Sequence, residues 1–166
     1  MTKPVLANDE RFRVYYYDAP PYEKSVTNPI DGTSVNLSNT PHAEASRRLL
    51  QRLELENGFA VRKGVLNNSG WKLGNAALKN LGVTQRPITA QDFVPVLSQK
   101  GVDMRIGLDI AWLALKRLVD VLVLVTGDSD FIPAMKLARR EGLLVYLETM
   151  GHPVIREVKV HADIVL

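Results

Sequence analysis

The stretch from Val121 to Phe131, VLVLVTGDSDF, restricts the fold of this chain more than any other. Its first five residues are all apolar, which is typical of a strand buried on both faces. The sequence then turns polar, and an amphipathic helical pattern begins near Ile132. A buried strand that leads into a polar turn and a helix is half of a βαβ unit, so we expect a parallel sheet.

The same alternation runs through the rest of the chain. Strands are predicted at 13–17, 59–66, 121–125, 143–147 and 163–166, and helices at 41–56, 106–118 and 132–141. Two segments lack a clear period and are predicted to be mostly loop, 24–39 and 67–99. The order of these elements predicts an α/β fold with a mainly parallel sheet and helices on both of its faces.

Composition limits the class of protein. A length of 166 residues predicts a single domain over residues 1–166. The 46% hydrophobic and 23% charged residues are ordinary for a globular protein. The chain has no cysteine, no apolar leader and no apolar run of membrane-spanning length, so we expect a cytoplasmic protein without membrane association. The net charge of +3 is compatible with nucleic acid but does not by itself argue for it.

Three aspartates form the strongest candidate site. Asp128 and Asp130 follow the strand 121–125, and Asp103 precedes the next upstream helix. In a parallel sheet both positions belong to the carboxyl edge, where ligands bind. Close carboxylates repel one another unless a cation holds them, and hard cations such as Mg²⁺ prefer oxygen ligands. The alternative for each aspartate is an ordinary helix cap. For the three together we favour a metal site.

Other polar groups extend this candidate site. Thr126 and Ser129 could bond a phosphate, although both residues are also common in turns. Lys100 and Arg105 could neutralise a phosphate charge, and solvent-exposed cations are their ordinary alternative. Asp18 ends the strand 13–17 and is a further candidate metal ligand by the same edge argument, with a turn as the alternative.

Several other chemistries have no support in the sequence. No GxSxG, Walker A or GxGxxG pattern occurs, which leaves serine-nucleophile and dinucleotide functions without a basis. The three histidines do not show metal-ligand spacing. Toprim and haloacid-dehalogenase folds also use acidic strand ends, but the further acidic motifs that they require are missing.

The chain resembles the NYN domain in its LabA-like branch. The resemblance is carried by KGVD at 100–103, TGDSDF at 126–131, YYDA at 16–19 and Ala162-Asp163, and it extends from about Arg13 to Leu166. NYN domains are similar to PIN-domain nucleases. The resemblance implies a Rossmann-like three-layer α/β/α sandwich and RNA cleavage that depends on Mg²⁺ or Mn²⁺. It places the acidic residues of the family on Asp103, Asp128 and Asp130.

The beginning of the chain departs from the family pattern. The family opens with a strand that ends in Asp-Gly-x-Asn, whose aspartate belongs to the metal site. Residues 1–12 contain no such strand, so we expect the first βα unit to be absent. The sheet position left unfilled could be covered by a partner subunit, as in a homodimer, or by the segment 67–99.

Two functions follow from these observations. The first is a metal-dependent ribonuclease that acts on RNA, which we expect to be single-stranded. The second is a catalytically impaired module of the same fold that binds RNA or a protein partner. The missing first aspartate is the best support for the second.

Overall fold

The computed structural model describes residues 10–84 and 86–166, and the expectation that no strand precedes Arg13 falls mainly on residues outside these ranges. The chain divides into two compact units. The first, called here the N-terminal unit, comprises residues 15–102. The second, the C-terminal unit, comprises residues 103–166 with residues 10–14 of the described chain. Each unit is described by itself.

The C-terminal unit is a small α/β assembly in which helices and strands alternate. Its elements are α3 (Val102–Leu115), β7 (Val121–Val125), η3 (Ser129–Phe131), α4 (Ile132–Arg140), β8 (Leu144–Glu148), α5 (Arg156–Val160) and β9 (Ile164–Val165). The strands form one parallel sheet in the order β7-β8-β9. The predicted βαβ unit is therefore confirmed in this part of the chain. The expected burial of its first strand on both faces is wrong, because Val123 and Val125 on β7 are 40% and 60% exposed.

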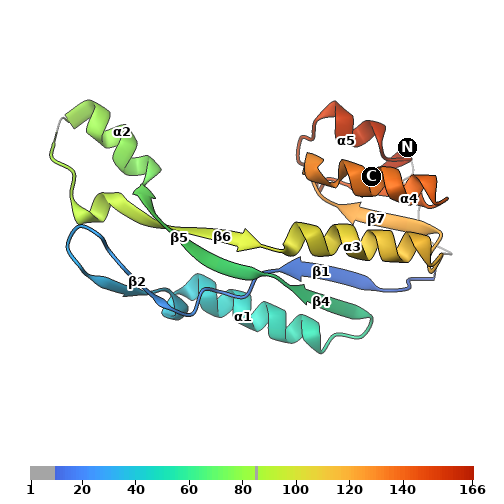
Figure 1. Cartoon of the computed structure of the whole chain (residues 1–166), viewed down its shortest axis with the longest axis horizontal. Coiled ribbons are helices and arrows are strands. Elements are labelled where there is room, and N and C mark those ends of the chain that lie inside the picture. The colour runs from blue at the N-terminus through green and yellow to red at the C-terminus, as the bar shows by residue number, and fades with distance from the viewer. Residues whose placement is uncertain (1–9, 85) are drawn as a thin grey trace. The chain divides into compact units, whose positions relative to one another are not determined.

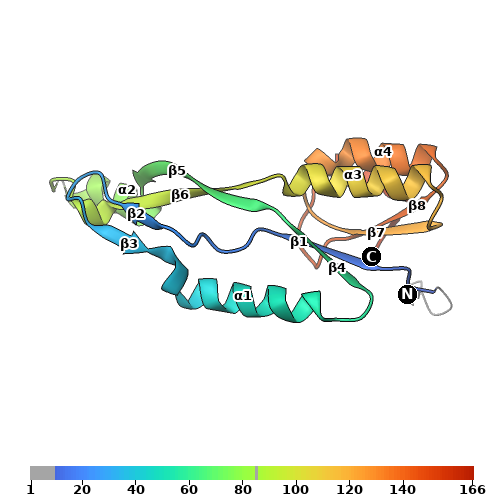
Figure 2. The ribbon, with the colours of Figure 1, turned by 60° about the horizontal axis from the view of Figure 1, so that its bottom comes forward.

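The core of this unit lies between its sheet and its helices. Met135, Val145, Leu147 and Val158 have their side chains completely buried. Figure 2 shows α3 and α4 on the same face of the strands. Ile110, Leu113 and Ala114 on α3 are buried in this core. Leu118 follows the end of the helix and is 39% exposed.

A carboxylate fastens the last strand of this unit. Asp163 precedes β9, and its Oδ2 accepts a hydrogen bond from the backbone N–H of Val145 at 2.8 Å. Its Oδ1 accepts one from Nε of Arg139 at 3.0 Å, so the side chain joins β8 to α4. Backbone bonds from the N–H groups of Asp163 and Leu166 to the carbonyls of Val145 and Leu147 complete the pairing.

The N-terminal unit is built mainly of strand pairs. Its elements are β1 (Val14–Asp18), β2 (Ser25–Thr27), β3 (Ser34–Asn36), η1 (Leu37–Asn39), α1 (Pro41–Glu54), β4 (Phe59–Lys63), β5 (Val65–Leu73), α2 (Asn75–Thr84), η2 (Ala90–Asp92) and β6 (Phe93–Lys100). β1 pairs with β4, while β2 with β3 and β5 with β6 are antiparallel pairs (Figure 1). Thr40 is the N-cap of α1, because its Oγ1 accepts a hydrogen bond from the N–H of Ala43 at 3.2 Å.

Three predictions about local structure were wrong in this unit. The segment 24–39 forms the β2–β3 hairpin, and the segment 67–99 is occupied largely by β5, α2 and β6. The strand predicted at 59–66 is interrupted at Gly64, where β4 ends and β5 begins. The described strands thus form four small sheets, of which β7-β8-β9 is parallel while β2–β3 and β5–β6 are antiparallel. The α/β class stands, whereas a three-layer sandwich is not visible within either unit and stays a prediction.

Candidate functional site

The turn after β7 is shaped by two polar side chains. The hydroxyl of Thr126 accepts a hydrogen bond from the backbone N–H of Asp128 at 3.1 Å. Oδ1 of Asp128 in turn accepts one from the N–H of Asp130 at 2.9 Å, which makes Asp128 the N-cap of η3. Phe131 is buried in the core and fixes the far side of the turn. The sequence TGDSDF therefore folds into a tight connection between β7 and α4, with both aspartates exposed.

Gly127 leaves room for a neighbouring loop. A Cβ at this position would approach Cγ1 of Val154 to 3.3 Å, which is closer than side chains normally pack. Its φ angle is not in the left-handed region. A larger residue here would therefore press against the loop that follows β8, and Val154 would have to shift by a few tenths of an ångström.

Asp103 lies in the first turn of α3. The preceding Gly101 has φ of 78°, which lets the chain turn sharply from β6 into the helix. Figures 1 and 2 both show α3 and β7 running in opposite directions, so that α3 begins at the end of the unit where β7 finishes. Asp103 and Asp128 consequently lie toward the same end of the C-terminal unit, and both are exposed.

The aspartates are not gathered into a preformed cluster. In the part of the chain that the structure describes, no three aspartate, glutamate or histidine side chains lie close enough together to hold a metal ion. One oxygen of Asp128 is already engaged as a helix cap. A cation at this end would therefore require the exposed carboxylates to change rotamer and converge on it.

The remaining predicted site residues are distributed over both units. Ser129 is exposed at the start of η3, and Thr126 is half-buried with its hydroxyl engaged in the turn. Arg105 is exposed in the first part of α3. Lys100 ends β6 in the N-terminal unit and is exposed. Asp18 also belongs to the N-terminal unit, where it lines a pocket.

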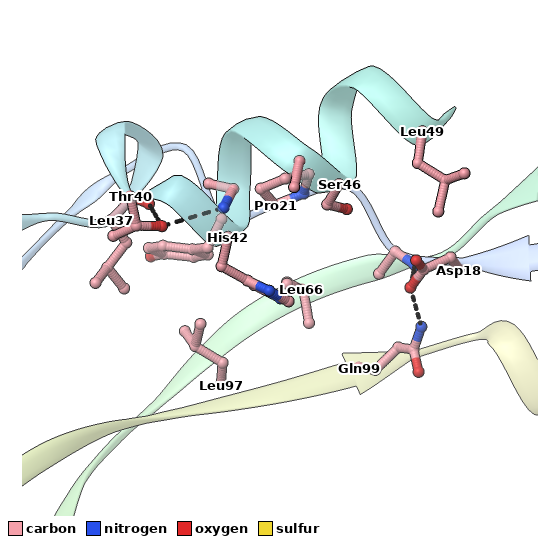
Figure 3. Close-up of a pocket in the computed structure, with 14 residues that line it drawn as sticks. Asp18, Pro21, Leu37, Thr40, His42, Ser46, Leu49, Leu66, Leu97 and Gln99 are labelled. Carbon is pink, nitrogen blue, oxygen red and sulfur yellow. Dashed lines mark hydrogen bonds between the residues drawn. The ribbon is translucent and has the colours of Figure 1, made fainter. Parts of the chain in front are cut away.

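That pocket lies between α1 and the strands β5 and β6 (Figure 3). Oδ1 of Asp18 accepts hydrogen bonds from the N–H of Ala19 at 2.7 Å and from Nε2 of Gln99 at 3.4 Å. The hydroxyl of Tyr16, two residues earlier on the same strand face, also bonds this carboxylate. Burial of the phenol raises the pKa of Tyr16, and the negative charge and hydrogen bond of Asp18 raise it further.

Several residues of this pocket were not identified from the sequence. His42 and Ser46 come from α1, whereas Gln99 comes from β6. The sequence indicates only that a helix beginning at Pro41 follows the strand that ends at Asp18. It does not indicate which face of that helix packs against the strands.

The NYN domain family matches residues 30–162, which is most of the chain. The chain belongs to the NYN domain family, within the NYN/PIN-like superfamily. Membership indicates a nuclease-like function related to RNA. Searches of curated proteins and of solved structures found no significant match. Within residues 10–84 and 86–166, no helix combines the length and apolar composition needed to cross a bilayer.

Proposed function

We propose that this protein is a metal-dependent ribonuclease of the LabA-like branch, with a PIN-like, Rossmann-like three-layer domain that hydrolyses phosphodiester bonds of single-stranded RNA. The observation that carries the proposal is the common position of Asp103 and Asp128. The helix that bears Asp103 begins at the end of the C-terminal unit where β7 delivers Asp128 and Asp130. The family match supplies the RNA-related chemistry.

The donor set suits a hard divalent cation. Asp103, Asp128 and Asp130 would hold Mg²⁺ or Mn²⁺, because carboxylate oxygens and water are the preferred ligands of these ions. When bound, such a cation neutralises phosphate charge and lowers the pKa of water, so that an oxygen nucleophile is available near neutral pH. The hydrogen bond from the N–H of Asp130 uses only Oδ1 of Asp128. The other oxygen of Asp128 would therefore be available to the cation while the turn keeps its conformation.

The polar residues near these carboxylates would handle the RNA. Hydrolysis requires water to attack phosphorus while a P–O bond to the leaving ribose oxygen breaks and that oxygen gains a proton. Arg105, in the same first part of α3 as Asp103, would contact a phosphate oxygen, as would Ser129. Thr126 would act through the turn, because its hydroxyl positions the backbone of Asp128. Lys100 would provide a further phosphate contact.

Cleavage of single-stranded RNA in the presence of Mn²⁺ tests this function. Asp128→Asn preserves the capping oxygen but removes the charge, so we expect cleavage to fall by about a hundredfold or more, given the several kcal/mol that a metal contributes. Asp120→Asn is the matched control, because Asp120 immediately precedes the opposite, amino end of β7 and is also exposed. Equal cleavage by both variants and the unaltered protein would refute the mechanism.

A second candidate function is a binding module of the same fold without turnover. The hydrogen bond from the N–H of Asp130 to Oδ1 of Asp128 favours it, because helix capping accounts for that carboxylate without any metal. RNA binding that weakens with salt, is unchanged by EDTA and leads to no cleavage would support this alternative over the enzyme.

A further inference from the structure

The N-terminal unit contains a cavity of about 580 Å³, which is within the range of small-molecule sites. Its walls are mainly apolar, and they come from the segment before α1, from α1 itself and from the two long strands. The largest apolar side chains of the lining are Leu37, Leu49, Leu66 and Leu97. Figure 3 shows His42 extending from α1 toward these strands, where its flat ring forms part of the wall. Such a cavity suits a planar apolar body with a polar edge.

The polar edge of the cavity is acidic. Asp18 provides the negative charge, and no lysine or arginine is among the lining residues. A phosphate group is therefore not the part of a ligand that enters. The bond between Gln99 and Asp18 is long at 3.4 Å, so a ligand that offers better donors can displace it. Gln99 would then keep its amide N–H groups for an acceptor on the same ligand.

The Watson–Crick edges of the four bases differ in how they match this arrangement. Guanine presents two adjacent donors, N1–H and N2–H₂, which a carboxylate accepts, and beside them an acceptor, O6, for an amide N–H. Adenine and cytosine place an acceptor nitrogen where it would face the carboxylate. Uracil has one N–H between two carbonyl oxygens, which the carboxylate repels. Only guanine matches both side chains.

We propose that the pocket between α1 and β5–β6 binds a guanine base through Asp18 and Gln99, with the aliphatic wall and His42 covering its faces. The proposal deepens the RNA-related function and rests on it for the source of the base, which is an unpaired guanine in RNA. A free guanine nucleoside presents the same edge. The N–H of Ala19 donates a hydrogen bond to Oδ1 of Asp18 at 2.7 Å and orients the carboxylate.

Calorimetric titration with guanosine, adenosine and inosine tests the proposal without any metal or cleavage. We expect guanosine to bind roughly tenfold more tightly than adenosine, in keeping with a bidentate contact to a base. Inosine lacks the N2 amino group and should fall between them. Asp18→Asn should abolish the preference. Glu56→Gln removes one charge from the exposed turn after α1, away from the pocket lining, and should keep the preference.

The outcomes separate this proposal from the nuclease. Equal affinity for guanosine and adenosine, or an unchanged preference in Asp18→Asn, would overturn it. Should Asp18→Asn fail to fold, as judged by circular dichroism, the exposed Gln99 replaced by alanine provides the test, because loss of the O6 contact should weaken the binding of guanosine and inosine but not that of adenosine. Tighter binding of UUGUU than of UUAUU supports an RNA source, and preference for the free nucleoside only supports a nucleoside site. Guanine binding that persists while cleavage is absent would refute the nuclease but not the pocket.

Discussion

Among the described glycines, Gly64 is the one where an added Cβ makes the shortest contacts, so substitution by alanine there should lower stability most. This buried glycine joins β4 to β5, and its N–H donates a hydrogen bond to the carbonyl of Asp18 at 2.8 Å. A Cβ built on it would lie 2.5 Å from Cγ2 of Val102 and 2.9 Å from the carbonyl oxygen of Lys100. The segment that it would strike leads directly into α3.

The cost of Gly64→Ala follows from these distances. The contact with Val102 is about 1 Å shorter than the roughly 3.5 Å at which carbon atoms normally meet. Val102 is buried, and the other close atom belongs to the backbone, so neither can move aside freely. Overpacking of this kind costs about 1–3 kcal/mol. For a chain of this size, the middle of that range lowers the melting temperature by about 4–8 °C.

Thermal unfolding followed by circular dichroism provides the measurement, with Gly82→Ala as the control. Gly82 lies inside α2, has no left-handed φ angle, and a Cβ built there meets no atom within 4 Å. Alanine should therefore stabilise that helix by about 0.5–1 kcal/mol. The two glycines should thus respond in opposite directions. A melting temperature for Gly64→Ala at or above that of the unaltered protein would refute the packing argument.

Two further predictions concern stability. Met135→Ala empties a completely buried position in the C-terminal unit and should cost about 2–5 kcal/mol in urea unfolding, whereas Met135→Leu should cost less than about 1.5 kcal/mol. The Arg86 guanidinium and the hydrogen bonds from Thr89 hold the pKa of Asp92 well below its ordinary value. Because that pKa is depressed by folding, the stabilisation is fully present above the unfolded value of about 3.9 and is lost as pH falls below it. Asp92→Asn should therefore lower the melting temperature at pH 7 by more than at pH 3, and an equal difference at both pH values would contradict this.

The elements that could be predicted from sequence are those specified by local rules. The apolar run from Val121 to Val125 has only one reasonable structure beside a polar turn, and it forms β7 as expected. Thr40 followed by Pro41 sets the start of α1, since the threonine side chain caps the helix and proline needs no hydrogen-bond partner at its first turn. Neither feature depends on distant residues.

The β5–β6 pair could not be predicted because its pairing is not local. β5 contains Asn67, Asn68, Ser69 and Gly70, which are residue types with low strand propensity. They form a strand because β6 supplies hydrogen bonds from residues that follow α2 in the chain, with an irregular register between Asn68 and Trp71. No short hairpin turn joins β5 to β6, so the sequence does not indicate that the two strands pair.

The candidate sites show the same division. Asp103, Asp128 and Asp130 were identifiable because strand ends and helix starts are local features, and their proposed metal role stays a prediction. The guanine pocket was not, because Asp18, His42 and Gln99 come from three elements that are brought together only by packing. Local sequence patterns do not indicate which distant residues will line the same pocket.

The carboxylate of Asp163 has a practical consequence for anyone who shortens or extends this chain. Deletion of residues 163–166 would strip β8 of its neighbour and leave the amide of Val145 and the carbonyl of Leu147 without the bonds that now satisfy them. A tag attached directly after Leu166 would begin beside an amide that is held by that carbonyl. A spacer of a few flexible glycines and serines is therefore advisable before the tag.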